Sequence, residues 1–384
     1  MSSPGLRPQE EFQLLCALAG GQLSPARVER VANWNLSALD WVEFIRLAEK
    51  HGVLPLAARN LIESAHALPA EVDRSLRSAY ESNLRRNLWF AAELARILQV
   101  FERAEIPMVP YKGPALAELV YGDLGLRYFS DLDFLIAPAD FARAEHALAE
   151  IGYRPTVEIE PAVERLWLRT GYERSFDSPA GKHLVELQWA LLPHFYAVDL
   201  RMEDLLARSG QAVLGDRELP CLSPEDSLLA LCLHAAKHLW TRLIWLADIA
   251  ETLRTQTIDY SLVLSRAHSL GIVRILAVSF WLAKNALGAE LPSFCRNLIA
   301  ADSRVPIVGR EFAERLALGA DYDFESTKYF RRILQLRERR CDRWRFVWRL
   351  LWTPGAGDIT AVRLPEPLFP LYRVVRMFRL MRKL

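Results

Sequence analysis

The sequence predicts an α+β protein in which a small β-sheet lies between helical regions. Apolar residues recur with a helical period over the first hundred residues and again after residue 223, whereas residues 106–193 hold short apolar runs separated by turn residues. The expected division is an N-terminal helical module over residues 1–105, a sheet core over 106–200, a helical domain over 201–330 and a basic, aromatic-rich tail over 331–384.

Length and composition fit a protein with buried cores. Its 384 residues suffice for two or three domains, and 51% of them are hydrophobic. No apolar run approaches the ~20 residues of a membrane span. The first residues lack the basic and apolar pattern of a secretion signal, and five scattered cysteines indicate free thiols. We therefore expect a cytoplasmic protein.

The first helical region contains two patterns with clear ends. Asp40 and Glu43 form a capping-box pattern for a helix that ends at His51-Gly52. Pro69 opens a longer helical pattern that runs to about residue 105. Four polar residues on this helix are candidate ligand contacts: Asn83, Arg85, Arg86 and Asn87. A solvated helix face is the favoured interpretation of these residues.

Two carboxylates stand one residue apart at the start of a short apolar run. Residues 133–136 are too few for a helix and fit a strand. Because strand side chains alternate, Asp131 and Asp133 would point to one face, and Leu132 and Phe134 to the other. Neighbouring carboxylates repel each other unless a cation lies between them, and hard oxygen ligands suit Mg²⁺ or Mn²⁺. The pair is a candidate metal site.

The segment before this pair favours an anion. Lys112-Gly113-Pro114 stands where an apolar run over residues 106–111 meets a helical pattern. Glycine lets a ligand approach the backbone, proline fits the first helical position, and the freed N–H groups would hold an anion together with Lys112. An Asp-x-Asp pattern alone is common by chance, but this combination is the layout of a metal-dependent phosphate site.

A third carboxylate is expected from a β-hairpin. Residues 172–177 and 183–189 are β-type runs separated by a five-residue loop. In the second run Glu186 shares a face with Leu184 and Gln188, so Glu186 would join the aspartate pair. The pattern alone leaves open a glutamate on a solvated edge strand. Between the aspartate pair and the hairpin, residues 138–151 and 158–170 are expected to be helical.

Beyond the sheet region the pattern returns to helices, which begin at a Ser-Pro-Glu-Asp start signal. On the first of these helices His234 and His238 fall on one face, with Lys237 beside them. A second helix over residues 242–254 brings Asp248 nearby. Three interpretations are open: a structural zinc site, which two histidines support weakly; a buried helix pair held by hydrogen bonds; and contacts with a ligand.

Several motifs in a fixed order carry a resemblance to a known family. They are Lys112-Gly113, residues 121–127, Ser130-Asp131-x-Asp133, Val185-Glu186-Leu187-x-Trp189 and His234-x-x-Lys237-His238-x-Trp240-x-Arg242-Leu243-x-Trp245-x-x-Asp248. This order resembles the polymerase-beta-like nucleotidyltransferase superfamily, and more closely its poorly characterised bacterial branch of nucleotidyltransferase family proteins. The similarity covers most of the chain. It is specific for the superfamily and weak on substrate.

The resemblance implies a small mixed sheet and in-line transfer of a nucleotidyl group from a nucleoside triphosphate, with pyrophosphate leaving. Asp131, Asp133 and Glu186 would bind two Mg²⁺ or Mn²⁺ ions, and Glu186 would accept the acceptor's proton. The superfamily has Gly-Ser where this chain has Gly113-Pro114, so Lys112 and Arg127 would replace the serine contact. The helical domain that follows the sheet would close the cleft. Nucleotide-binding residues would be Lys112, Gly113, Arg127, Ser130, Lys237, His238, Arg242 and Asp248.

The tail over residues 331–384 differs from the rest of the chain. It holds fourteen Lys and Arg against four Asp and Glu, a charge of +10, whereas the whole chain carries +1. Arg373, Arg376 and Arg379 recur every third residue among apolar and aromatic neighbours. Three partners are open: an anionic membrane surface, RNA, or the acidic remainder of the chain itself, with tryptophans inward and arginines outward. Docking on the chain is favoured, and nucleic acid least.

The predicted function is Mg²⁺-dependent transfer of a nucleoside monophosphate to a hydroxyl on a small molecule, glycan precursor or peptide. ATP is the default donor because it is abundant, since no residue selects adenine. Two alternatives are open. The first, which the missing serine favours, is a nucleotide-sensing or partner-binding module with weak turnover. The second is nucleotidyl transfer to RNA or protein. The expected location is the cytoplasm, with the tail as a possible contact to the inner membrane surface.

Overall fold

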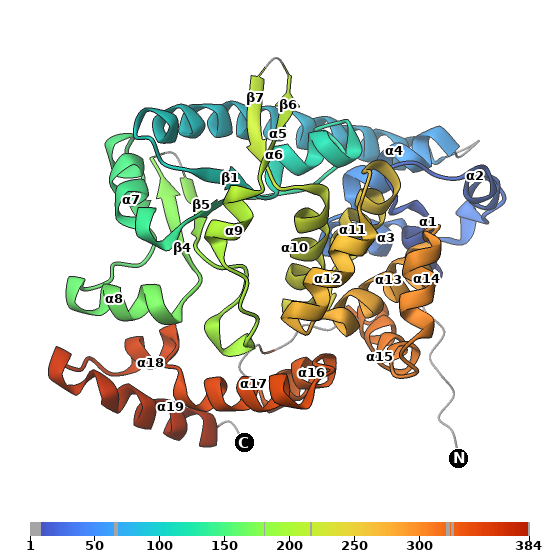
Figure 1. The fold of residues 1–384 in the computed structure, drawn as a ribbon. Helices are drawn as coiled ribbons and strands as arrows, with labels where there is room; N and C mark the ends of the chain where they lie inside the picture. The colour runs from blue at the N-terminus through green and yellow to red at the C-terminus, as the bar shows by residue number, and fades with distance from the viewer. Residues whose placement is uncertain are drawn as a thin grey trace.

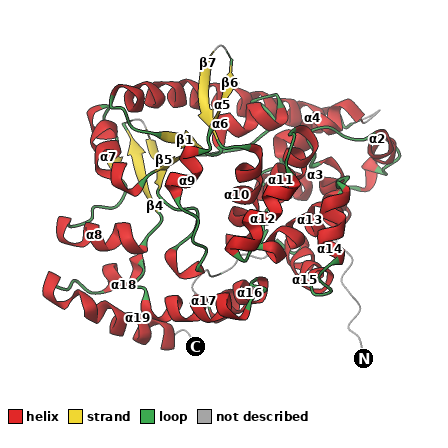
Figure 2. Cartoon of the chain, in the orientation of Figure 1, coloured by secondary structure: helices red, strands yellow, loops and turns green. Residues whose placement is uncertain are grey.

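A computed structural model describes residues 9–64, 68–179, 181–215, 217–319, 323 and 326–382. Helices make up most of the chain, and a five-stranded sheet lies among them (Figure 2). The predicted α+β class is confirmed.

Five helices precede the sheet: α1 (Glu10–Leu18), α2 (Pro25–Ala32), α3 (Trp41–Lys50), α4 (Leu54–Ser64) and α5 (Ala70–Arg103). The Asp40 side chain accepts hydrogen bonds of 3.0 Å from the amides of Val42 and Glu43, so it caps α3 as predicted. The long helix α5 confirms the pattern that Pro69 opens. It extends from the N-terminal helices to the sheet (Figure 1).

The sheet has the strand order β1 (Met108–Pro110), β2 (Leu132–Ile136), β5 (Gly181–Gln188), β4 (Glu173–Ser178) and β3 (Arg154–Pro155). Strands β2 and β5 are parallel and the other neighbours antiparallel, so the sheet is mixed. The short helix α6 (Gly113–Leu116) follows β1, and α7 (Phe141–Glu150) and α8 (Pro161–Thr170) lie between β2 and β4. The prediction of a five-residue loop in this hairpin is wrong. β4 ends at Ser178 and β5 begins at Gly181, so the loop is shorter.

The chain then forms α9 (Met202–Ala207) and a separate hairpin of β6 (Gly210–Leu214) and β7 (Arg217–Cys221), which the sequence patterns did not predict. A group of helices follows: α10 (Pro224–Lys237), α11 (Leu243–Thr255), α12 (Tyr260–Leu270), α13 (Val273–Leu287), α14 (Ser293–Ala300) and α15 (Val305–Ala317). Side chains of the N-terminal helices and of this group belong to one hydrophobic core. The five cysteines are free, as expected.

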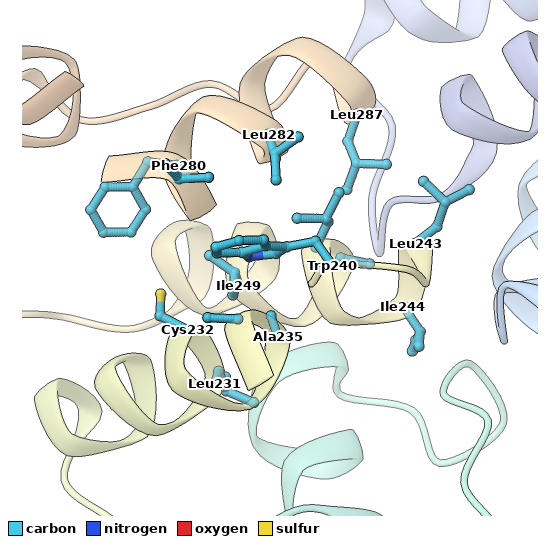
Figure 3. Packing of buried hydrophobic residues seen from close by; sticks show 14 of the residues in the cluster. Leu231, Cys232, Ala235, Trp240, Leu243, Ile244, Ile249, Phe280, Leu282 and Leu287 are labelled. Atoms are coloured by element: carbon cyan, nitrogen blue, oxygen red, sulfur yellow. The ribbon is translucent and has the colours of Figure 1, made fainter. Parts of the chain in front are cut away.

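Trp240 anchors the turn between α10 and α11. Figure 3 shows its indole among side chains of α10, α11 and α13, where it is fully buried, and its Nε1 donates a 3.0 Å hydrogen bond to Ser279. Both Leu239 and Trp240 have φ near 50°, a left-handed conformation that side chains with a Cβ rarely adopt. Burial of Trp240 therefore stabilises an otherwise unfavourable turn, and this turn carries His238 and Arg242.

The tail packs against the rest of the chain through α16 (Thr327–Leu336), α17 (Arg340–Trp352), α18 (Ala356–Ala361) and α19 (Tyr372–Met381) (Figure 1). Arg349 binds Asp199, and Phe346 is buried beside Phe195. The expected orientation of the tail, with tryptophans inward and arginines outward, is wrong, since Trp344 is 75% exposed and Arg376 is buried. No helix in the described ranges is long and apolar enough to cross a membrane.

Candidate active site

Asp133 and Glu186 lie side by side on the two central strands. β2 and β5 pair in parallel with Asp133 opposite Glu186, so both side chains belong to one face of the sheet. Asp131 stands two residues before Asp133 and returns to the same face. All three line a cavity of about 480 Å³ whose other walls come from α10 and α11. The structure thus brings together the three carboxylates that the sequence placed on one face.

Lys112 reaches this group from the turn after β1. Its Nζ lies 3.1 Å from Asp133 Oδ2 and 3.5 Å from His234 Nδ1. The turn depends on Gly113, which has φ of 57°, and a Cβ there would lie 3.5 Å from the carbonyl oxygen of Asp131. Gly113 therefore supports the turn and is not among the residues that line the cavity. The expected helix start at Pro114 is present in α6.

Gln188 joins two of the carboxylates. Its Nε2 donates hydrogen bonds of 2.7 Å to Asp133 Oδ1 and 3.2 Å to Glu186 Oε2. Both oxygens of Asp133 thus accept from protein donors, one from Lys112 and one from Gln188. Any cation that binds Asp133 competes with these two side chains.

The carboxylates are crowded electrostatically. Burial, followed by the charge of Asp133, raises the pKa of Asp131 to about 6. Burial, followed by Asp133 and Glu173, raises the pKa of Glu186 to about 9. Burial acts to lower the pKa of Lys112, but the surrounding carboxylates outweigh it and raise this pKa. Lys112 therefore stays charged and does not fully offset the carboxylates.

The donor set fits a hard divalent cation. In the described part of the chain, no three His, Cys, Asp or Glu side chains are already grouped in a way that could hold a metal ion. The chemistry of the wall is nevertheless suitable, because Asp131, Asp133 and Glu186 offer carboxylate oxygens from adjacent strands. The raised pKa values of Asp131 and Glu186 also reflect an excess of negative charge that a cation would relieve.

Helix α10 supplies the opposite wall. The Lys237 Nζ lies 4.6 Å from the centre of the Tyr172 ring and 3.5 Å from its hydroxyl, and burial lowers the pKa of Lys237. Burial, followed by nearby lysines, holds the pKa values of His234 and His238 well below the usual range, so both are neutral at pH 7. Both histidines also pack against the Trp245 ring, at 5.4 and 4.9 Å between centroids.

Asp248, which is expected to contact the nucleotide, does not line the cavity. It is 1% exposed and accepts two hydrogen bonds of 2.9 Å from Arg127 and one of 2.8 Å from the Tyr121 hydroxyl. Arg127 does line the cavity. Burial acts to lower the pKa of Arg127, but Asp248 outweighs it and raises this pKa. Asp248 therefore positions Arg127 at the wall.

The remaining predicted residues lie at the cavity rim. Ser130 is exposed, with its Oγ 3.4 Å from Asp131 Oδ2. Arg242 is exposed, with its guanidinium 5.8 Å from the centre of the Trp245 ring. Both line the cavity, so of the eight predicted nucleotide-binding residues only Gly113 and Asp248 lie outside its lining.

Polar residues of α5 hold the loop that leads to the carboxylates. Asn83 donates to the carbonyl of Gly125 at 2.8 Å, and Asn87 donates to that of Arg127 at 2.8 Å. Both asparagines are buried, so the interpretation of this stretch as a solvated face is wrong for them, and they contact backbone instead of a ligand. Arg85 is exposed, as that interpretation expects.

Sequence reasoning missed Tyr172 and Glu173, which line the cavity beside Lys237. Glu173 lies opposite Gln188 in the β4–β5 pair, so it belongs to the face that carries Glu186. Side chains alternate between the two faces along each hairpin strand, but only the pairing register of the strands shows that Glu173 and Glu186 share a face.

Comparison with known proteins identifies the family of the chain. A family model described as "Uncharacterised nucleotidyltransferase" matches residues 37–288, which is more than half of the chain and includes the whole cavity lining. Comparison with curated proteins found no match. The chain belongs to this uncharacterised nucleotidyltransferase family, an enzyme family that transfers nucleotidyl groups.

Proposed function

We propose that this enzyme transfers a nucleoside monophosphate, with ATP as the default donor, to a hydroxyl group in a reaction that depends on Mg²⁺ or Mn²⁺. The observation that carries the proposal is the placement of Asp133 opposite Glu186 on adjacent parallel strands, with Asp131 on the same face. Lys112 adds a buried positive charge 3.1 Å from Asp133.

In the proposed reaction the acceptor oxygen attacks the α-phosphorus of the triphosphate. The bond from that phosphorus to the bridging oxygen breaks, and pyrophosphate leaves. Glu186 takes the hydroxyl proton, a role that requires proximity above all. Asp131, Asp133 and Glu186 would hold the divalent cation, which when bound neutralises phosphate charge and favours the ionised form of Glu186.

Cationic side chains support a proposed position for the triphosphate. The catalytic cavity adjoins a second hollow of about 700 Å³ that shares Arg242, Tyr128 and Gly52 with it. Lys50 and Arg86 also line that hollow, and the Arg86 guanidinium stacks 4.2 Å from the centre of the Tyr128 ring. We therefore propose that the nucleotide extends from the carboxylates towards Arg242.

One observation favours a second candidate, a nucleotide-binding module with weak turnover. Gly113 is followed by Pro114, which has no N–H and no hydroxyl for a phosphate. In addition, Lys112 is already paired with Asp133. Such a module would bind nucleotide with Mg²⁺ and release no pyrophosphate.

Pyrophosphate release separates the two candidates. Each of the four nucleoside triphosphates is incubated with Mg²⁺ or Mn²⁺ and a cell extract as the source of acceptors, with the wild type and the Asp131→Asn/Asp133→Asn variant. We expect release by the wild type that the variant loses, and mass spectrometry of the extract then identifies the modified acceptor. A matched control is Asp73→Asn/Asp140→Asn, which changes two partly exposed carboxylates that pair with nearby arginines and line neither cavity.

Absence of release from both proteins, with Mg²⁺-dependent nucleotide binding retained, would overturn the enzymatic proposal in favour of the binding module. Release that persists in the Asp131→Asn/Asp133→Asn variant would overturn the assigned site.

A further inference from the structure

A second cavity continues the catalytic face of the sheet. In the β4–β5 pair Glu173 lies opposite Gln188 and Ser175 lies opposite Glu186, so the face that carries Asp133 extends across β4. Tyr172 and Glu173 line both the catalytic cavity and this second cavity, which has a volume of about 490 Å³. The second cavity therefore begins where the catalytic one ends.

The walls of the second cavity are largely apolar. Aromatic and aliphatic side chains line it from α8 and the segment before it, from residues 194–196 and from α16 and α19: Val157, Ile159, Trp167, Phe195, Phe330 and Leu380. Apart from Glu173, which also lines the catalytic cavity, the charged groups in the wall are already paired. Arg376 and Arg379 both bind Asp358, at 3.2 and 2.6 Å, and Arg174 binds Glu145 at 2.8 Å. The wall therefore offers little net charge to a ligand.

Two buried nitrogens of residues in this wall, Trp167 Nε1 and Arg174 Nε, have no hydrogen-bond partner among the described residues. A buried N–H without an acceptor is unfavourable, and a ligand atom in the adjoining cavity would satisfy it. The cavity is thus suited to a molecule with an apolar body and a few polar atoms.

The tail forms one side of this cavity. The lining residues that lie outside the part matched by the family model are Phe330, Thr353, Pro354, Gly355, Gly357, Asp358, Arg376, Arg379 and Leu380. Helix α8 faces α18 and α19 in Figure 1, and Val163 packs against Ile359 and Tyr372. The cavity is therefore built jointly by the family region and the chain that follows it.

The two ends of the catalytic cavity differ in character. One end carries Arg242 and continues to Lys50 and Arg86, which suits a triphosphate, whereas the other opens past Glu173 to the apolar walls. We infer that the second cavity holds the acceptor, and that the acceptor is a hydroxyl compound with an aliphatic or aromatic body. Burial of a bare sugar there would leave most of its hydroxyls without partners.

This inference rests on the proposed function and specifies its substrate class. The acceptor body lies beneath the tail, and its hydroxyl points past Glu173 to Glu186. The reaction stays as written above: the hydroxyl oxygen forms the new bond to the α-phosphorus, its proton goes to Glu186, and pyrophosphate leaves.

Two glucosides that differ only in their apolar body test the inference. Binding of octyl β-D-glucoside and methyl β-D-glucoside to the full chain is measured by ligand-observed NMR, for the wild type and for Val157→Trp. Val157 is 52% exposed and lines the cavity, so a tryptophan there should fold and narrow the space. The matched control is Val213→Trp, at a 57% exposed valine that does not line the cavity.

We expect the octyl compound to bind and the methyl compound to bind at least about tenfold more weakly. Val157→Trp should weaken octyl glucoside binding by about tenfold or more, while Val213→Trp should not. Equal binding of the two glucosides, or equal behaviour of the two tryptophan variants, would overturn the inference.

Nucleotide binding and pyrophosphate release are measured on the same samples. Selective octyl glucoside binding that only Val157→Trp weakens, in a protein without pyrophosphate release, would support the apolar cavity and contradict the proposed function. Pyrophosphate release without selective octyl glucoside binding would contradict the cavity assignment alone.

A separate observation concerns the outer surface of the tail. Trp344 and Trp348 are 75% and 62% exposed, and Trp348 stacks on Trp352 with ring centroids 5.1 Å apart. The Arg373 guanidinium lies 5.9 Å from the Trp352 ring. The acidic groups Asp342 and Asp358 are buried in ion pairs with arginines. The exposed surface thus combines indole rings with positive charge.

We propose that this tryptophan surface, formed by Trp344, Trp348 and Trp352, binds the headgroup region of an anionic bilayer. Indole rings favour the membrane interface, and arginines are attracted to anionic lipids. Co-sedimentation with phosphatidylglycerol-containing vesicles should therefore exceed that with pure phosphatidylcholine vesicles. Trp344→Ser/Trp348→Ser should abolish the difference, whereas Trp89→Ser, at a 47% exposed tryptophan of α5, should keep it. Binding to an RNA oligonucleotide without binding to either vesicle would overturn the proposal.

Discussion

Arg127 and Asp248 are joined by two hydrogen bonds of 2.9 Å between side chains that are almost fully buried. Arg127 lies in the loop before β2, and Asp248 lies on α11. The pair therefore connects the loop that leads to Asp131 with the helix that lines the other side of the cavity. It fixes the distance between two walls that come from distant parts of the sequence.

Removal of one partner should be strongly destabilising. Asp248→Ala leaves the Arg127 charge buried without its partner, and we expect the free energy of unfolding to fall by about 3–5 kcal/mol, as measured by denaturant titration. In the Arg127→Met/Asp248→Leu variant neither charge remains, so most of this loss should be recovered. A double variant as unstable as Asp248→Ala would contradict this account.

The turn between α10 and α11 should depend on the Trp240 ring. Trp240→Ala opens a large space in the core and removes the burial that stabilises two left-handed residues, so a loss of about 3–5 kcal/mol is expected in thermal or denaturant unfolding. Trp344→Ala makes the same chemical change at a 75% exposed site and should alter stability by no more than about 0.5 kcal/mol. Similar losses in both variants would argue against the assigned role of Trp240.

His51 should make the fold sensitive to acid. Burial, followed by the charge of Lys50, lowers the pKa of His51 to about 4 from its ordinary value of 6.5. Above pH 6.5 the imidazole is neutral in both states. As the pH falls from 6.5 to 4, the unfolded chain binds the proton first, so about 3 kcal/mol of stability is lost.

His51→Leu should remove this loss, which is seen by comparing unfolding free energies of the variant and the wild type at pH 7 and pH 4.5. His146→Leu is the control, because this histidine is 79% exposed at its side chain. If the His51→Leu variant keeps the full acid sensitivity of the wild type, other groups are responsible for it.

Local patterns were sufficient for much of the fold. The Asp40 cap, the long helix α5 and the alternation that places Asp133 and Glu186 on one face all depend on residues close in sequence. The hairpin of β6 and β7 lacked such a pattern, because Pro220 lies inside β7 and proline demotes a run to an edge strand.

Contacts between distant segments could not be predicted in the same way. Asn83 and Asn87 look like part of a polar helix face, and only the docking of the loop over residues 124–129 on α5 explains their burial. Asp248 is of a residue type that often contacts ligands, yet its partner is Arg127, 121 residues away. A polar residue on a helix does not reveal whether its partner is a ligand or the backbone of another segment.

Through Glu186, a rise in pH should destabilise the folded state, whereas a bound cation should stabilise it. Its pKa of about 9 means that the cation-free folded protein holds the proton while the unfolded chain releases it near pH 4.5, so the folded state loses stability as the pH rises from 4.5 to 9. Glu186→Gln keeps a neutral group of the same shape, so the cation-free variant should unfold at a higher temperature than the wild type at pH 8.

The same substitution removes the proton acceptor and one carboxylate ligand. We therefore expect Glu186→Gln to lower the rate of pyrophosphate release by about 10²–10⁴-fold and to reduce the Mg²⁺-dependent rise in melting temperature. Glu150→Gln is the control, since the side chain of this α7 glutamate is 65% exposed and lines none of the cavities described above. A Glu186→Gln variant with wild-type release and wild-type stabilisation by Mg²⁺ would show that Glu186 is not part of the site, because neutralising a carboxylate that binds a cation or takes a proton must change at least one of the two measurements.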